Sequence, residues 1–436
     1  MKPTRRCLLL FGLGFGAALL PVFAGPALWP LWLAYVALPL LLTGADPILG
    51  LPARALDVAV TLPPRIYIGE RDVATVALAA PRGPRTTTIE VLADLDEGLV
   101  PQPMRSVALV AGGQTTLPVP LVPLRRGRFA VQRLWLRWTG PLGLMARVRI
   151  QPVEGAVGVV PNPRPPRGAA LRLLRRDARV GLKVIRHVGE GSEFESLREY
   201  VPGLDARALD WKASARHRKL VVQEYRPERN HQIILAIDTG HLMREPLGGI
   251  PKLDHAINAT LLLARVCLRT GDRVGTYAFD AKARAFAEPR GGVRTFARLQ
   301  RLTADLEYST AETNFTLGLA QLSGRLHRRS FIVLLTDFVD TVTAELMVEN
   351  VGRLARRHLV TFVTLRDPGL EETIAAPPTS RGSLYRTVVS DGFAQERDLV
   401  LRRLGSLGIF CIDAPPHLVS TELLNRYLDV KRRELI

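Results

Sequence analysis

The sequence predicts a mixed α/β protein with three folded parts: an N-terminal two-helix transmembrane hairpin, a β-sandwich-like middle domain and a C-terminal doubly wound α/β domain. Three observations support this: an uncharged apolar run at the start, short β-rich runs in the middle, and alternating apolar strands and amphipathic helices towards the end. At 436 residues the chain is about three times a typical domain. The predicted boundaries are 1–45, 46–162, 163–230 and 231–436, where residues 163–230 form a linker.

The first predicted element is the hairpin. No charged residue lies between Cys7 and Ala45, a run about twice the length that one transmembrane helix needs. The run is broken at residues 23–26, so we expect spans at 7–22 and 27–42. Gly12 and Gly16 form a G-x-x-x-G pair that would let the second helix approach closely.

Basic residues before the hairpin set its expected orientation. They place the N-terminus in the cytoplasm, and two crossings return the chain to that side of the inner membrane. The soluble domains are therefore expected in the cytoplasm. The alternative is a cleaved signal peptide over residues 1–24, which the second apolar run disfavours. The basic residues are Lys2, Arg5 and Arg6.

The middle domain is predicted from short strands separated by Gly and Pro, without a long stretch of helical period. Such a series is typical of a β-sandwich, here a spacer or interaction module. The predicted strands are residues 65–68, 73–78, 87–92, 115–122, 129–138 and 147–150.

A basic linker follows, within a chain of net charge +18. Arginines and lysines are dense between Arg164 and Arg186, and they would suit an anionic lipid surface at about 1 kcal/mol per residue. A solvated linker face is the alternative. The three cysteines have no metal-ligand or disulfide spacing.

The next block carries a specific motif: E-F-x-x-L-R-x-Y from Glu193, then D-x-R from Asp205, then D-W-x-x-x-A-R from Asp210. With these motifs the chain resembles the MoxR-associated family known as domain of unknown function 58 (DUF58), and the resemblance covers essentially the whole chain. The chain departs from the family at Leu204, where an aspartate is usual. The motif residues of interest are Glu193, Phe194, Arg198, Tyr200, Asp205, Arg207, Asp210, Trp211 and Arg216.

These motif residues alternate acids and bases around two aromatic side chains. Asp205 is expected to cap a helix through Trp211, with Arg207 and Asp210 at i, i+3 on it. We expect these residues to form a buried network that holds the sandwich against the next domain. Truncating Trp211 would then lower the free energy of unfolding by about 3 to 5 kcal/mol. An interaction surface for a partner is the alternative.

Past residue 230 apolar strands alternate with helices, which predicts a mostly parallel sheet whose ligands gather at the carboxyl ends of the strands. The expected strands are residues 232–238, 273–279, 284–288, 331–337, 359–365 and 409–412, with 273–279 and 284–288 as an edge hairpin. The expected helices are residues 252–270, 344–357 and 394–407.

Two of these strands end in aspartate, Asp238 and Asp337. The arrangement resembles the metal site of von Willebrand factor A-like domains, in which the first strand carries Asp-x-Ser-x-Ser. Here Gly240 and Leu242 replace both serines, and Thr313 would supply the loop threonine. A hard cation needs about six oxygens, so we expect no cofactor, or Mg²⁺ at low affinity, and otherwise carboxylates that accept backbone N–H bonds.

No phosphate loop, nucleophile elbow or zinc-protease motif is present, so we expect no enzyme. The resemblance implies a membrane-anchored, non-catalytic adaptor or assembly factor that acts with a MoxR-type AAA+ ATPase through the loops of the A-like domain. Two alternatives stay open. One is a metal-dependent ligand-binding protein, and the other is a basic lipid-surface binder or, less favoured, a nucleic-acid binder.

Overall fold

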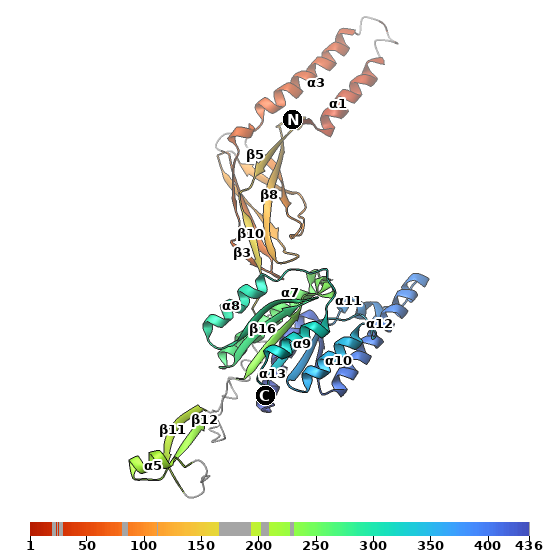
Figure 1. The fold of residues 1–436 in the computed structure, drawn as a ribbon. Helices are drawn as coiled ribbons and strands as arrows, with labels where there is room; N and C mark the ends of the chain where they lie inside the picture. Colours follow the sequence, from red (N-terminus) through yellow and green to blue (C-terminus); the bar gives the residue numbers. More distant parts are fainter. Residues whose placement is uncertain are drawn as a thin grey trace. The chain divides into compact units, whose positions relative to one another are not determined.

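The computed structural model describes residues 1–19, 23, 25, 29–80, 86–110, 112–164, 193–201, 209–226 and 231–435. The chain forms two compact units, Met1–Val160 and Pro161–Ile436. Figure 1 traces them in sequence colours, from red at the N-terminus to blue at the C-terminus.

The first unit begins with two helices, α1 (Arg5–Ala17) and α3 (Trp29–Leu49). Within the described ranges, one helix, Trp29–Ala55, is long and apolar enough to cross a membrane. α1 has 13 residues, which span roughly 20 Å against a hydrocarbon core of about 30 Å. A single apolar helix of membrane-spanning length therefore stands where the sequence predicted two spans.

The two helices contact each other at Gly14. The indole N–H of Trp32 donates to the Gly14 carbonyl at 3.1 Å, and a Cβ on Gly14 would lie 2.8 Å from Cε1 of Tyr35. A Cβ on Gly12 or Gly16 would meet nothing within 4 Å. The prediction that Gly12 and Gly16 form the contact is wrong, because the glycine that faces α3 is the one between them.

The β domain contains two sheets. One has seven strands, in the order β1-β9-β8-β10-β3, with β5 also paired to β8 and β6 paired to β5. The other has the order β2-β4-β7. Burial alternates along most strands, as in two sheets packed face to face. All six predicted strands lie on observed ones. The strands are β1 (Lys2–Pro3), β2 (Asp57–Thr61), β3 (Arg65–Tyr67), β4 (Asp72–Ala79), β5 (Thr86–Leu95), β6 (Arg105–Val110), β7 (Gln114–Leu121), β8 (Gly127–Thr139), β9 (Met145–Pro152) and β10 (Ala156–Val160).

A buried carboxylate joins the helices to this domain. Asp46, in the last turns of α3, has no exposed surface. Its two oxygens accept the backbone N–H groups of Leu142, Leu144 and Met145 at 2.7 to 2.8 Å. Leu142 and Leu144 belong to the turn between β8 and β9, and Met145 is the first residue of β9. At the start of the other helix, the hydroxyl of Thr4, the N-cap of α1, donates to the carbonyl of Gly143 in the same turn at 2.7 Å.

The second unit contains a small hairpin and a larger α/β domain. The hairpin pairs β11 (Glu193–Glu199) with β12 (Val221–Arg226), and α5 (Trp211–His217) lies between them in the chain.

The α/β domain has a six-stranded sheet in the order β17-β16-β13-β18-β19-β20, parallel except for β17 at one edge. The strands are β13 (Gln232–Asp238), β16 (Arg273–Phe279), β17 (Ala283–Arg290), β18 (Phe331–Leu335), β19 (Leu359–Leu365) and β20 (Phe410–Ala414). All six strands fall where the sequence predicted them, including the edge hairpin of β16 and β17. The parallel strands are recognisable because buried parallel strands are nearly continuous apolar runs.

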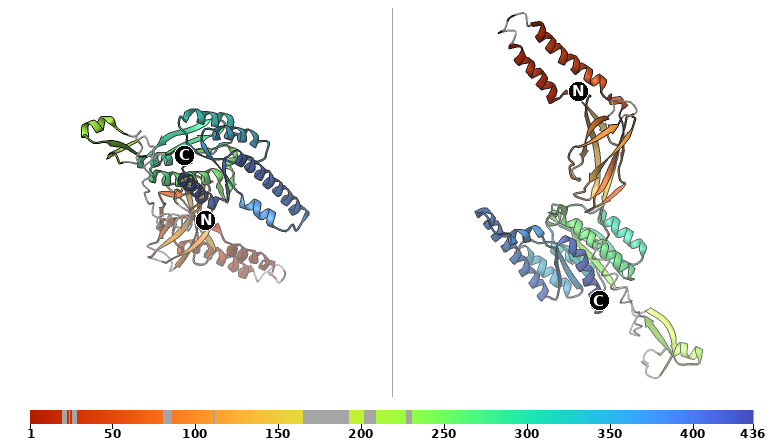
Figure 2. Two further views of the ribbon diagram at one scale, coloured as in Figure 1. Left: turned by 90° about the horizontal axis from the view of Figure 1, so that it is seen from below. Right: turned by 180° about the vertical axis from the view of Figure 1, so that it is seen from behind.

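Helices cover both faces of this sheet (Figures 1 and 2). Residues of α7 (Lys252–Arg269), α8 (Val293–Ala304) and α13 (Pro416–Arg432) pack in the core on one face. Residues of α9 (Phe315–Arg325), α10 (Ala344–Ala355) and α12 (Arg381–Ser406) pack on the other. The short elements are α6 (His241–Arg244), α11 (Pro368–Ala375), β14 (Pro246–Leu247) and β15 (Ile250–Pro251).

The sequence underestimated the helices. The predicted helix 394–407 is the second half of the 26-residue α12, and α8, α9, α11 and α13 were not predicted. The first half of α12 carries exposed apolar residues, among them Tyr385 and Val388, rather than a face buried against the sheet.

We predict that Asp46→Asn destabilises the first unit by about 3 kcal/mol. The amide keeps the shape of the side chain, but its NH₂ group faces a backbone N–H that has lost its acceptor. Thermal melts of the detergent-solubilised chain measure the loss. Asp57→Asn, at an exposed position on β2, is the matched control, and equal melting temperatures for the two variants would contradict the role of Asp46.

Candidate functional site

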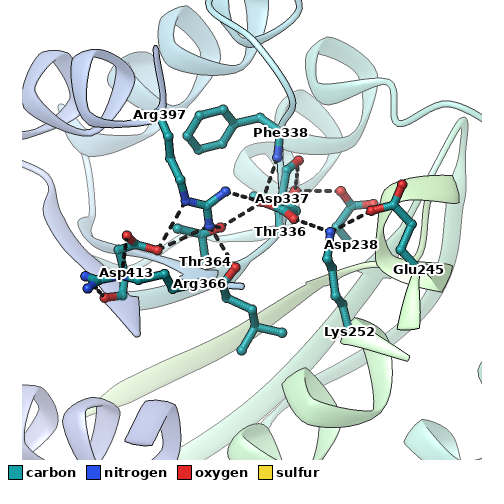
Figure 3. Close-up of polar contacts among 11 residues, drawn as sticks. Asp238, Glu245, Lys252, Thr336, Asp337, Phe338, Thr364, Arg366, Arg397 and Asp413 are labelled. Atoms are coloured by element: carbon teal, nitrogen blue, oxygen red, sulfur yellow. Dashed lines mark hydrogen bonds and ion pairs between the residues drawn. The ribbon is translucent and has the colours of Figure 1, made fainter. Parts of the chain in front are cut away.

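A cluster of charged side chains lies at the carboxyl ends of the parallel strands (Figure 3). Asp238 ends β13, Asp337 follows β18, Arg366 follows β19, and Asp413 lies in β20. In a parallel sheet these ends meet at one edge, which is where ligands of such folds gather. The cluster is the candidate site of this protein.

Asp238 is 1% exposed and accepts three hydrogen bonds. Its Oδ1 accepts from the Gly240 N–H at 2.8 Å and from the Thr313 hydroxyl at 2.7 Å, and its Oδ2 accepts from the Thr336 hydroxyl at 2.6 Å. Burial raises the pKa of Asp238 to about 6, although these donors oppose the rise. The structure thus brings the predicted residues Asp238 and Thr313 together.

Gly240 makes the Thr313 contact possible. A Cβ at position 240 would lie 2.0 Å from Oγ1 of Thr313, so a serine would push Thr313 away from Asp238. The glycine that departs from the Asp-x-Ser-x-Ser pattern therefore removes one metal ligand and lets a threonine hydroxyl bond directly to the carboxylate.

Asp337 is also buried, and cations hold it. Its Oδ2 forms an ion pair with Lys252 Nζ at 2.8 Å, and its Oδ1 with Arg397 Nη1 at 2.9 Å. The Phe338 N–H and the Thr364 hydroxyl also donate to Oδ1. Burial would raise the pKa of Asp337, but the charges of Arg397 and Lys252 outweigh it and hold the pKa below its ordinary value.

Both cations have further acidic partners. Lys252 Nζ lies 2.7 Å from Oε2 of Glu245, whose side chain is largely exposed. Arg397 also pairs with Asp413 at 3.2 Å, and Asp413 pairs with Arg366 at 3.0 Å. The cluster is therefore a chain of alternating charges across the strand ends.

These residues do not fit a divalent cation. A metal at this place would need free oxygens of Asp238 and Asp337, but both oxygens of each carboxylate already accept bonds. The Lys252 ammonium occupies the position of a cation beside Asp337, and two positive charges so close repel. In the part of the chain that the structure describes, no group of three or more His, Cys, Asp or Glu residues is placed to hold a metal.

The two carboxylates also bind the loops that follow their strands. Asp238 accepts the N–H of Gly240, and Asp337 accepts the N–H of Phe338. These bonds confirm the expectation that the aspartates accept backbone N–H groups from those loops.

Thr239 holds the end of β13 to the neighbouring strand. Its hydroxyl donates to the carbonyl of Phe279, the last residue of β16, at 3.1 Å. A cavity of about 400 Å³ lies beside Thr239 and is lined by three acids, Asp280, Asp305 and Glu307. Asp280 is paired with Arg284 at 2.7 Å.

Sequence reasoning missed the cations of the site. Lys252 is the first residue of α7, and Arg397 lies in the middle of α12, 60 residues from Asp337. Neither carries a local motif. The only signal was indirect: two buried acids without enough metal ligands require positive charge from elsewhere in the chain.

The DUF58-like motif residues form the hairpin, not the charged cluster. Asp210 is the N-cap of α5, where its Oδ1 accepts the N–H groups of Lys212 and Ala213 at 3.0 and 2.9 Å. The prediction of a helix capped by Asp205 that continues through Trp211 is therefore wrong, because the helix starts at Trp211. Trp211 is 70% exposed, which also contradicts its predicted burial.

The other motif residues are only partly described. Tyr200 donates its N–H to the Leu220 carbonyl at 2.7 Å, and Arg216 is exposed. Glu193, Phe194 and Arg198 lie in β11, opposite Arg226, Tyr225 and Val222, and their side chains lie outside the described part. Asp205 and Arg207 lie outside the described residues.

Comparison with protein families finds a match to the model described as protein of unknown function DUF58, over residues 196–376. This range contains α5 of the hairpin and Asp238, Thr313 and Asp337 of the site. The uncharacterised proteins Mb1516 of Mycobacterium bovis and Rv1480 of Mycobacterium tuberculosis are each 25% identical over 213 residues. The match covers 47% of this chain and 66% of each relative, slightly less than two thirds of their length.

Similar solved structures include the conserved hypothetical protein BatB from Bacteroides thetaiotaomicron, at 12% identity and a TM-score of 0.32 over 47% of this chain and all of that one. They also include the VWA domain of SpRpn10, at 10% identity and a TM-score of 0.28 over 45% of this chain and 94% of that one. At these scores the likenesses carry no argument about function.

The raised pKa of Asp238 predicts a pH-dependent stability. Because its folded pKa of about 6 lies above the ordinary value of 3.8, folding favours the neutral carboxyl. Its contribution is therefore present below pH 4 and is lost as the pH rises towards 6, by up to about 3 kcal/mol. Relative to Asp238→Asn, the unmodified chain should lose stability from pH 4 to 6 and then level off, as thermal melts would show. A difference in stability between the unmodified chain and Asp238→Asn that stays the same from pH 4 to 6 would refute this prediction.

Because Lys252 and Arg397 already hold Asp337, we predict that the full chain does not bind Mg²⁺ with micromolar affinity. Lys252→Met removes one of the two cations that hold the buried Asp337, so it should destabilise the domain by about 3 kcal/mol. Millimolar Mg²⁺ should then raise the melting temperature of Lys252→Met more than that of the unmodified chain or of Lys282→Met, a change at an exposed lysine. Calorimetry that finds micromolar binding, abolished by Asp238→Ala, would show that the site is a metal centre.

Proposed function

We propose that this protein is a membrane-anchored, non-catalytic adaptor that binds a protein partner through the loops around Asp238, Thr313 and Asp337. We propose a MoxR-type AAA+ ATPase as that partner, on the basis of the DUF58-like motifs. The observation that carries the proposal is that Lys252 and Arg397 complete the charge balance of the site without a metal.

Because the charges of the site are balanced by the protein's own side chains, the site is better suited to bind a partner than to react with a substrate. Asp238 and Asp337 are each held by two or more donors, so every oxygen of these two carboxylates is already engaged within the protein instead of facing a substrate proton. The pairing fixes the loops that leave β13 and β18, and preorganised loops lose less conformational entropy on binding.

The rim of the site has surface that suits a protein partner. Val342, in the loop after β18, is 79% exposed, and Val339 and Leu346 nearby are also exposed. The first residue of α6, His241, is exposed as well. Apolar side chains beside a charged cluster are typical of the core and rim of protein interfaces.

The alternatives have less support. A metal-dependent receptor requires carboxylate oxygens that Lys252, Arg397 and the threonines already engage. A lipid-surface or nucleic-acid binder would use the basic segment from Arg164 to Arg186, which lies almost wholly outside the described residues.

The proposed anchor is the two-helix hairpin, with the soluble domains in the cytoplasm. Its support is the apolar helix of membrane-spanning length, the contact between α1 and α3, and the basic residues Lys2, Arg5 and Arg6 before them. A reporter fused after Ile436 should be active in the cytoplasm, and periplasmic activity would overturn this topology.

Binding to the MoxR-type ATPase of the same organism tests the adaptor role. We expect the solubilised full chain to capture the purified ATPase, and Val342→Asp to weaken binding at least tenfold because it puts a charge on the apolar rim. Arg356→Glu, at an exposed position just past the far end of α10, is the control and should bind normally. No binding by the unmodified chain, or equal binding by both variants, would contradict the proposal.

A further inference from the structure

The first half of α12 presents an apolar stripe that the domain does not cover. Val400 and Leu404, in the second half, are buried against the sheet. In the first half Tyr385 is 73% exposed and Val388 is 62% exposed, and Val389 is also exposed. Contiguous exposed apolar surface of this kind marks an interaction site in soluble domains.

The stripe lies on one side of the helix. At about 100° per residue, the positions 381, 385, 388, 389, 392 and 396 fall within roughly 50° of a common direction. Thr387, whose hydroxyl donates to the Thr373 carbonyl of α11 at 3.3 Å, is on the opposite side. The stripe is therefore free of α11, the helix that precedes α12 in the chain.

The stripe is symmetric about a point between Val388 and Val389. Equal steps from that point reach Tyr385 and Gly392, and then Arg381 and Glu396. Each pair is complementary. The large ring of Tyr385 is paired with Gly392, where an added Cβ would meet nothing within 4 Å. The positive charge of Arg381 is paired with the negative charge of Glu396.

We propose that a second copy of this chain docks on the stripe, with the two α12 helices antiparallel and related by a two-fold axis between Val388 and Val389. Such an interface is isologous, so each complementary pair forms twice. Tyr385 of each copy lies over Gly392 of the other, and Arg381 of each copy pairs with Glu396 of the other.

The charges on the stripe favour this occupant over a lipid surface. A helix that lies on an anionic membrane carries basic residues along its polar side, whereas the stripe ends in the acidic Glu396. Among the described residues neither Arg381 nor Glu396 forms an ion pair; Glu396 accepts only a 3.3 Å hydrogen bond from the Thr341 N–H. Both charges are therefore available to a partner.

The contact involves about four turns of one helix, so it should be smaller than a standard interface and give a weak dimer. Since Arg397, which binds Asp337, follows Glu396 directly, each α12 would link the dimer contact to its own site. The inference does not depend on the adaptor role, because it concerns a different surface and a different partner.

Disulfide trapping in the solubilised full chain tests the register. Tyr385→Cys/Gly392→Cys places two cysteines face to face across the two-fold axis, so mild oxidation should give a covalent dimer. In either single variant the two copies of the cysteine lie roughly 10 Å apart along the helices, beyond the reach of a disulfide. We expect at least fivefold more covalent dimer from the double variant than from either single one; equal yields, or none, would overturn the proposed register.

Charge reversal tests the dimer without cysteines. In sedimentation at about 50 µM, a concentration suited to a weak dimer, the unmodified chain should be dimeric, Glu396→Arg monomeric, and Arg381→Glu/Glu396→Arg dimeric again. Both positions are on the surface, so loss of folding is not expected. A monomeric unmodified chain would overturn the proposal, and so would a Glu396→Arg variant that stays dimeric, because the membrane helices alone would then account for association.

Discussion

The α/β domain depends on the neutralisation of two buried carboxylates, Asp238 and Asp337, at the carboxyl edge of its sheet. A buried charge without partners costs several kcal/mol, so the surrounding chain has to supply either donors or cations. Asp238 is held by hydroxyl and backbone donors and has a raised pKa, whereas Asp337 is held by Lys252 and Arg397 and has a lowered one. Two acids of one edge are thus stabilised in opposite ways.

The pairing of Asp337 also ties together the two faces of the sheet. Lys252 belongs to α7, which packs on one face, and Arg397 belongs to α12, which packs on the other. A metal ion at this place would contact only the loops, whereas Lys252 and Arg397 also connect their helices, α7 and α12, to Asp337. The carboxylate therefore connects the site with the long helix whose first half carries the exposed stripe.

The same chemistry recurs in the first unit. Asp46 accepts three backbone N–H groups from the turn between β8 and β9 and from the start of β9, and Gly140 leaves room for its carboxylate, since a Cβ there would lie 2.3 Å from Oδ1. One acid thereby fixes the apolar helix to the β domain. A charged residue at the end of an apolar helix is retained here because the turn satisfies it completely.

The sequence by itself determined the strands and part of the site. Apolar runs located the strands of the parallel sheet, and acids at the ends of β13 and β18 placed Asp238 and Asp337 on one edge. These features are local, since period and strand polarity decide them. Thr313, which donates to Asp238 at 2.7 Å, was indicated only by the resemblance to the A-like metal site. Tertiary structure decided that Lys252 and Arg397 take the place of a cation, that Gly14 and not its neighbours faces α3, and that Trp211 is exposed. Such outcomes depend on residues far apart in the chain, whose pairing no local pattern encodes.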